Sequence, residues 1–239
     1  IDMHIAPEMQ YIQESFKGIR TLGDLDSVFT NTPALNMLNM RYLIYNDAAA
    51  PLKNNKALGN AWFVQNYKIL KDTPLGGTTY TADDLEIKML GSVNPGKTAL
   101  VVNKFKDELE GKSLAFDPES SIQLTSYKPN EVVYKSKSKT ENLALFSEIY
   151  YPLAWTATID GQPASHFRSN WLLRSMVIPA GEHTIVFKNY AETYWTLRNM
   201  SSILSLIMLL AVLGVIGYEV YGAWKSSNGT KATSVAKKD

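Results

Sequence analysis

The feature that most constrains this sequence is a long run without charge near its carboxyl end. No residue between Arg198 and Glu219 is charged, and residues 203–216 are apolar except for Ser205. A helix needs roughly 20 mostly apolar residues to cross the hydrocarbon core of a bilayer. A helix is also the only structure that one segment can adopt in lipid, because each backbone amide and carbonyl needs a partner within that segment. We therefore predict a transmembrane helix over residues 199–221.

Aromatic residues flank this run on both sides, at Tyr194, Trp195, Tyr218, Tyr221 and Trp224. Tyrosine and tryptophan gather where membrane-spanning helices meet the headgroup layer. The alternative is the buried core helix of a soluble protein, but uncharged runs of this length are uncommon in soluble folds. The flanks thus favour a lipid bilayer as the partner of this segment.

The charges around the run predict its orientation. The segment after it contains four lysines, opposed only by the terminal aspartate: Lys225, Lys231, Lys237, Lys238 and Asp239. Cytoplasmic segments next to membrane helices carry an excess of lysine and arginine. We expect residues 225–239 to be a disordered cytoplasmic tail and residues 1–198 to be extracytoplasmic. An alternative, a tail-anchored cytoplasmic protein, also fits the position of the helix.

The chain begins at Ile1 with neither an initiator methionine nor a signal segment. An exported domain needs a signal or a preceding membrane segment. We therefore expect this sequence to be a fragment of a longer protein.

Composition excludes several classes of function. Lysine and arginine (24) nearly cancel aspartate and glutamate (23), so we expect no nucleic acid partner. The sequence has no cysteine, which excludes disulfides, thiol catalysis and cysteine-ligated metal.

Residues 97–190 show an alternating pattern that is typical of antiparallel strands with one solvated face. Asp160-Gly161 is a favoured centre for a two-residue hairpin, and Lys128–Asn130 and Pro179–Gly181 mark further turns. Together they predict a β-sandwich domain. The expected strands are 98–103, 122–127, 131–138, 143–150, 155–159, 172–178 and 184–189.

Residues 1–96 have a mixed pattern. Apolar spacing predicts a helix over residues 7–19, Thr32-Pro33 opens a short helix, and Thr81 with Asp84 forms a capping box for a helix that ends near Gly91. Strands are expected at residues 41–45 and 61–65, on either side of a polar stretch. The predicted fold class is mainly β: an antiparallel β-sandwich preceded by a small α+β region and followed by a single transmembrane helix.

The strongest functional candidate is a group of aromatic and arginine side chains between Tyr150 and Arg174. Aromatic faces stack on sugar rings, and polar groups fix their hydroxyls. Core packing is the alternative role, and we expect Trp155 in the core and Trp171 in an exposed loop. The candidate ligand-binding residues are Tyr151, Arg168, Trp171 and Arg174.

The sequence contains no motif for a metal site, a phosphate site or a catalytic carboxylate pair. His4, His166 and His183 lack metal-ligand spacing, and Asn94–Thr98 lacks the upstream glycine of a phosphate loop. The carboxylate pairs at residues 83–84 and 107–108 fall on expected helices, where capping and solvation explain them. We predict no catalytic residue, metal or cofactor for this chain.

Several segments resemble YfhO-type bacterial membrane proteins, which are polytopic proteins that end in an extracytoplasmic β domain and a last membrane helix. The stretches that carry the resemblance are Leu35–Ile44, Leu58–Val64, Tyr150–Pro152, Trp155, Asp160-Gly161 and Pro179–Thr184. The resemblance implies a membrane glycosyltransferase of C-type architecture, which uses a lipid-linked sugar to decorate cell-envelope polymers. It places the catalytic acidic residue on an early extracytoplasmic loop that is not in this sequence.

We therefore expect a periplasmic accessory domain and last helix of such an enzyme in the bacterial cytoplasmic membrane. Its expected partners are the remaining membrane helices of the parent protein and an envelope glycan or lipid-linked sugar. The alternative is a membrane-tethered module that binds glycan or protein. Further membrane spans upstream in the gene would favour the former, and a lone signal peptide the latter.

Overall fold

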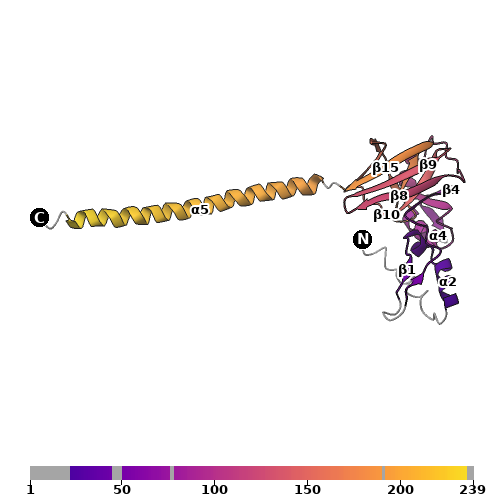
Figure 1. Ribbon diagram of the computed structural model, residues 1–239, viewed down its shortest axis with the longest axis horizontal. Coiled ribbons are helices and arrows are strands. Elements are labelled where there is room, and N and C mark those ends of the chain that lie inside the picture. Colours follow the sequence, from indigo (N-terminus) through magenta and orange to yellow (C-terminus); the bar gives the residue numbers. More distant parts are fainter. Residues whose placement is uncertain (1–21, 45–49, 76–77, 190–191, 236–239) are drawn as a thin grey trace. The chain divides into compact units, whose positions relative to one another are not determined.

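Two units make up the chain in the computed structural model, residues 1–190 and residues 191–239. The structure describes residues 22–44, 50–75, 78–189 and 192–235 (Figure 1). The helix expected over residues 7–19 lies outside the described residues.

Two antiparallel sheets form a sandwich in the first unit, as predicted. The five-stranded sheet has the order β12-β11-β15-β9-β8, and the four-stranded sheet has the order β13-β14-β10-β3. The first sheet comprises β8 (Ser121–Lys128), β9 (Glu131–Ser138), β11 (Trp155–Ile159), β12 (Gln162–Ala164) and β15 (Gly181–Asn189). The second comprises β3 (Ala61–Phe63), β10 (Asn142–Ile149), β13 (Phe167–Ser169) and β14 (Leu173–Ile178).

Alternation along the strands produces the core between these sheets. In β9, Val132 and Tyr134 are buried while Lys135 and Lys137 are exposed, as expected for a strand with one solvated face. Rings from three strands meet edge to face, with Tyr134 and Phe187 both contacting Phe146 at centroid distances of 4.9 Å. Such contacts add to the free energy gained by burying the rings.

Two turns bear out the sequence analysis. Asp160 (φ 51°) and Gly161 (φ 82°) both have positive φ between β11 and β12, as a type I′ hairpin requires. The Asp160 carboxylate accepts a hydrogen bond from the backbone amide of Thr184 (2.8 Å) and contacts His183 Nδ1 (2.6 Å). Pro179 and Ala180 connect β14 of one sheet to β15 of the other.

The front of the chain supplies elements to the same compact unit. It contains α2 (Leu22–Asn31), α3 (Pro33–Met37), β1 (Tyr42–Leu43), β2 (Leu52–Lys53), β4 (Asn66–Leu70), β5 (Thr73–Leu75), β6 (Thr78–Tyr80) and α4 (Ala82–Leu90). Strand β3 joins the sandwich by pairing with β10. Sequence regions 1–96 and 97–190 are therefore connected by a shared sheet.

One strand that we expected in the antiparallel sandwich belongs to a separate two-stranded sheet. Strand β7 (Thr98–Val102), which leads into a 3₁₀ helix, η1 (Asn103–Glu108), pairs in parallel with β4. Its residues Ala99–Val102 are all buried, so this strand is a continuous apolar run and does not alternate. Such a run is typical of strands covered on both faces.

Other expected elements differ in extent. The strand predicted over residues 41–45 is only Tyr42–Leu43, paired with β2 from within the stretch expected to be polar. The short strands β12 and β13 were not predicted. The helix opened by Pro33 and the capping box of α4 are confirmed, and Thr81 Oγ1 accepts a hydrogen bond from the Asp84 amide at 3.2 Å.

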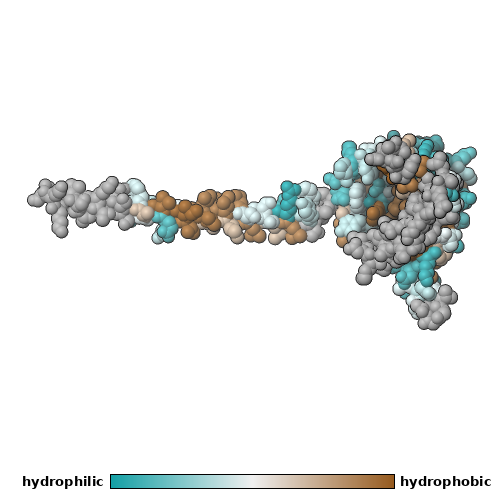
Figure 2. All heavy atoms as spheres, turned by 90° about the horizontal axis from the view of Figure 1, so that it is seen from below, coloured by the Kyte–Doolittle hydropathy of each residue, from teal (hydrophilic) through white to brown (hydrophobic). Residues whose placement is uncertain are grey.

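Helix α5 (Glu192–Val235) makes up most of the second unit. Its segment Tyr194–Lys225 is, among the described residues, the one helix long and apolar enough to cross a membrane, and none of its most apolar part is buried within the chain. Figure 2 shows hydrophobic residues along much of the described part of α5.

The helix continues to Val235, through most of the segment expected to be a disordered tail. Extending an existing helix avoids the cost of nucleation, and residues 226–235 contain no proline. Residues 236–239 lie outside the described part.

We predict that Gly161→Val destabilises the first unit by about 2 kcal/mol, because a β-branched residue is strained at positive φ. The control is Gly91→Val, since Gly91 has a right-handed φ of −71° and, like Gly161, open space where a Cβ would lie. Urea unfolding of the detergent-solubilised chain, followed by near-UV circular dichroism, measures both variants. Equal unfolding midpoints for the two variants would contradict the hairpin assignment.

Candidate functional site

The structure separates the four candidate ligand-binding residues by exposure. Tyr151 lies between β10 and β11 and is 49% exposed, whereas Arg174 on β14 is 1% exposed. Arg168 on β13 and Trp171 in the β13–β14 loop are partly buried. Arg168 and Arg174 are directly opposite each other in the pairing of these strands. No single exposed face therefore contains all four side chains.

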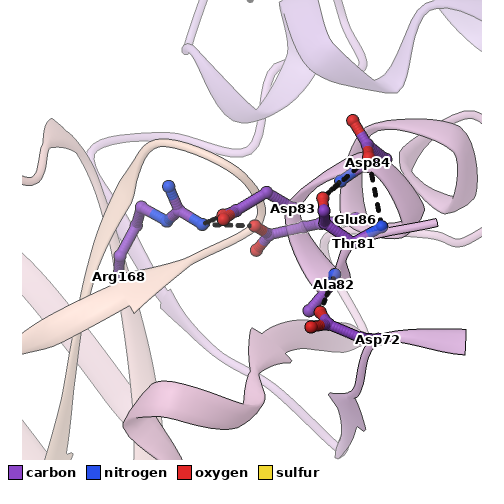
Figure 3. Close-up of polar contacts among 7 residues, drawn as sticks. All are labelled: Asp72, Thr81, Ala82, Asp83, Asp84, Glu86 and Arg168. Carbon is purple, nitrogen blue, oxygen red and sulfur yellow. Dashed lines mark hydrogen bonds and ion pairs between the residues drawn. The ribbon is translucent and has the colours of Figure 1, made fainter. Parts of the chain in front are cut away.

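Arg168 is held by two carboxylates of α4. Its Nη2 contacts both Asp83 and Glu86 (Figure 3), and the distance to Glu86 Oε2 is 3.0 Å. Asp83 and Glu86 are three residues apart, which places them on one face of the helix. The capping box at Thr81 and a hydrogen bond from the Ala82 amide to Asp72 fix the start of that helix. This ion-pair cluster thus ties α4 to the edge of the sandwich.

Glu86 is the most perturbed acid of this cluster. Its side chain is wholly buried, and burial raises the pKa of Glu86 to about 7, against the lowering effects of the Trp171 backbone and the Arg168 guanidinium. Burial disfavours the charged form of a carboxyl group because water no longer solvates it. Glu86 can therefore hold or release a proton near neutral pH.

The loop that carries Trp171 has an unusual backbone. Asn170 (φ 48°) and Trp171 (φ 72°) both have positive φ, which is rare for residues other than glycine. Asn170 holds the loop in place, since its side-chain oxygen accepts from the Leu100 amide (2.7 Å) and its own amide donates to the Leu100 carbonyl (2.9 Å). The loop is thereby fastened to β7.

Trp171 and Trp155 do not divide into an exposed and a core residue as expected. Both are partly buried, and Trp171 packs against the apolar cluster around β7 while Trp155 packs against the cluster between the sheets. The hydrogen bonds of Asn170 bring the loop down onto β7, so Trp171 loses the exposure that its position in a loop suggested.

Arg174 lies within the sandwich, between two aromatic rings. Its guanidinium carbon is 4.6 Å from the ring centroids of both Trp155 and Phe187, and Nη2 donates to the Ile149 carbonyl at 3.1 Å. Aromatic faces attract a cation, and this attraction is stronger when the cation is shielded from water. These contacts compensate in part for the burial of the guanidinium.

The groups around Arg174 respond to burial and to its charge. Burial lowers the pKa of His166 to about 4, and the charge of Arg174 adds to this effect, so the imidazole is neutral at neutral pH. Burial raises the pKa of Glu148, while Arg174 lowers it. His166 packs edge to face on Tyr150 and Phe187. These groups therefore belong to the interior of the sandwich and not to an exposed binding face.

Among the described residues, no three histidine, aspartate or glutamate side chains come together in a way that could hold a metal ion. His183 borders the Gly181 turn, as expected, and a Cβ at Gly181 would lie 3.0 Å from its Nε2. His4 lies outside the described residues.

Sequence reasoning missed the role of Asp83 and Glu86. Asp84 caps the helix, as the sequence suggested, but its neighbour Asp83 also pairs with Arg168, although its side chain stays partly exposed. The available signal was the spacing of Asp83 and Glu86 on one helical face. The partner of these two carboxylates could not be found from sequence, because Arg168 is 82 residues beyond Glu86.

No protein-family model, curated protein or solved structure matches the chain.

Glu86 should make stability depend on pH. In the folded chain its pKa is about 7, against 4.5 for an ordinary glutamate, so the folded state keeps a proton that the unfolded state has released. The stabilisation is present below pH 4.5 and is lost as the pH rises to 7, in total roughly 3 kcal/mol. Glu86→Gln cannot titrate and should lack this fall in urea unfolding between pH 5 and 8. Parallel pH profiles for the two proteins would refute the assignment.

Arg168→Met should destabilise the chain by roughly 3 kcal/mol at pH 8, because it leaves the Glu86 charge buried without its partner. The loss should shrink at pH 5, where Glu86 is protonated. Lys137→Met is the matched control, since Lys137 pairs with Glu182 at the surface and both side chains are about 70% exposed, so its effect should stay below ~1 kcal/mol. Equal losses for the two variants would argue against a buried ion pair.

Proposed function

We propose that this chain is the extracytoplasmic accessory domain and last membrane helix of a YfhO-like membrane glycosyltransferase that acts on cell-envelope polymers. The chain itself forms no glycosidic bond in this proposal. The observation that carries it is a long apolar helix, unburied within the chain, that follows a folded β domain.

The surface of α5 supports insertion in a bilayer. Large apolar side chains between Tyr194 and Trp224 are exposed, among them Leu209 at 55% and Val215 at 64%. Keeping so much apolar surface in water is costly, and a helix apolar on all sides is found in a protein core or in a membrane. The hydroxyls of Ser202 and Ser205 donate to carbonyls four residues earlier, at 2.9 and 2.8 Å. The hydroxyl groups of both serines therefore have hydrogen-bond partners within the helix, as a segment in lipid requires.

Contacts between the segments that carry the family resemblance support the accessory role. Asp160 of the hairpin and His183 of the Pro179–Thr184 segment are 23 residues apart and meet at 2.6 Å. The distinctive residues therefore maintain the architecture of the sandwich. In this proposal, the sandwich shapes or covers the place where a lipid-linked sugar meets an envelope acceptor, next to the other membrane helices of the parent protein.

The orientation is the first point to test. The chain lacks cysteine, so Thr125→Cys in the exposed part of β8 and Ser227→Cys after the apolar run each introduce a single thiol. On intact spheroplasts, a membrane-impermeant maleimide should label Thr125→Cys, whereas Ser227→Cys should react only after lysis. The reverse pattern would indicate a tail-anchored cytoplasmic protein. Labelling of both thiols on intact cells would contradict a membrane-spanning helix.

The enzymatic context needs a separate test. Deleting the gene that encodes this chain should change the sugar composition of the envelope polymers, and reintroducing the gene should restore it. The Arg168→Met variant should restore it less well, in proportion to its loss of folded protein. An unchanged sugar composition, together with retention of envelope glycan by the purified chain, would instead favour a membrane-tethered binding module.

A further inference from the structure

The five-stranded sheet has one end from which the chain leaves for α5. The last residue of β15, Asn189, pairs with Trp155 of β11, and its amide donates to the Asn130 carbonyl at 2.9 Å in the β8–β9 turn. The end of β8, the start of β11 and the end of β15 therefore lie together. We call this the exit end of the sandwich.

Exposed apolar side chains gather at the exit end. Throughout residues 97–189, which are all described, the large exposed apolar side chains are Phe116 and four others: Tyr127 (64% exposed), Ile149 (64%), Tyr151 (49%) and Leu153 (79%). Tyr127 on β8 pairs with Val132 on β9, which pairs in turn with Phe187 on β15. Phe187 is two residues before Asn189. Ile149, Tyr151 and Leu153 come just before Trp155. These four residues form the exit-end patch.

The patch is held in shape by the residues beneath it. The Tyr151 carbonyl accepts hydrogen bonds from the amides of Ala154 (3.4 Å) and Trp155 (3.2 Å), which closes a turn around Leu153. Arg174 joins the two sheets here, since it donates to the Ile149 carbonyl and stacks on Trp155. The apolar side chains are therefore presented by an ordered turn, although water surrounds them in the isolated chain.

The short segment between β15 and the apolar part of α5 limits how far the exit-end patch can lie from a membrane that α5 crosses. Tyr194, where the apolar segment of α5 begins, is five positions after Asn189, and this length of chain spans at most roughly 18 Å. The polar layer of a bilayer is about 5–8 Å thick on each side of the hydrocarbon core. If α5 crosses the membrane, the exit end cannot lie far from the headgroups.

The charges at the exit end suit a lipid surface. Lys128 and Lys188 both contact Glu131, at 3.6 and 3.5 Å, which leaves one net positive charge among the three. Both lysine side chains are more than 60% exposed. Apolar and aromatic tips beside lysines are typical of surfaces that lie in the interfacial layer, where lysine can reach the lipid phosphates.

We propose that the exit-end patch rests in the headgroup layer of the bilayer that α5 crosses, with Leu153, Tyr151, Ile149 and Tyr127 inserted among the lipids. This inference rests on the membrane insertion of α5 in the proposed function. The contact restricts the tilt of the sandwich relative to the membrane, so the opposite end, where β15 begins, points away from it.

The test uses the full chain, whose lack of cysteine allows single thiols to be introduced. Leu153→Cys, Ser121→Cys and Leu209→Cys are each labelled with an environment-sensitive fluorophore and reconstituted into phosphatidylethanolamine–phosphatidylglycerol vesicles. Ser121 is the matched control, because it is exposed at the opposite end of β8. Nitroxide lipids, labelled at the headgroup or along the acyl chain, then quench fluorophores that lie in the membrane.

The label at Leu153 should lose fluorescence with the headgroup nitroxide, the label at Leu209 with the acyl-chain nitroxide, and the label at Ser121 with neither. A label at Tyr127→Cys should behave like the label at Leu153, so that the result does not depend on one substitution. Near-UV circular dichroism establishes that each variant is folded. Quenching at Leu209 but not at Leu153 or Tyr127 overturns the docking of the patch and leaves the membrane span intact. Loss of quenching at Leu209 as well overturns the membrane span itself.

Discussion

The pairing of β15 along both of its edges is the constraint on which the sandwich depends. This strand pairs with β9 from Gly181 to Lys188 and with β11 from Ile185 to Asn189, while Ile185 and Phe187 fill the core. Between Ile185 and Lys188 the strand is paired on both sides and leaves no edge open to other chains. Because α5 follows β15 in sequence, any force on the helix acts on a strand that is paired on both sides.

The two arginines of the β13–β14 pair show how the interior accommodates charge. Like charges directly opposite each other destabilise a sheet, yet Arg168 and Arg174 occupy one register pair. Each has its own means of compensation: Arg168 reaches two carboxylates on α4, and Arg174 lies between Trp155 and Phe187. Both residues were ligand-contact candidates in the sequence. In the structure, Arg168 links the front region to the sandwich, and Arg174 joins the two sheets at the exit end.

The structure distinguishes two kinds of exposed apolar surface. Along α5 the apolar residues cover all sides of a helix, which the hydrocarbon core of a bilayer can solvate. At the exit end they form a small patch beside lysines on an ordered turn, which matches the interfacial layer. The exit end includes Asn189, which is only five positions before the apolar segment of α5, so one bilayer can cover both surfaces. In the docking that we propose, the membrane would therefore orient the sandwich as well as tether it.

Local signals in the sequence were enough for the long apolar helix, most strands, the Asp160-Gly161 hairpin and the Thr81 capping box, because hydrophobic period, charge-free length and turn chemistry act between near neighbours. The parallel pairing of β7 with β4, the Arg168–Glu86 contact and the half-burial of Trp171 were decided by tertiary structure alone. Each depends on segments that are far apart in the chain, and burial there changes the outcome: the pKa of the Glu86 carboxyl group rises, and an aromatic side chain in a loop packs against the core. No local pattern records which distant residue supplies the partner, so only the folded chain determines it.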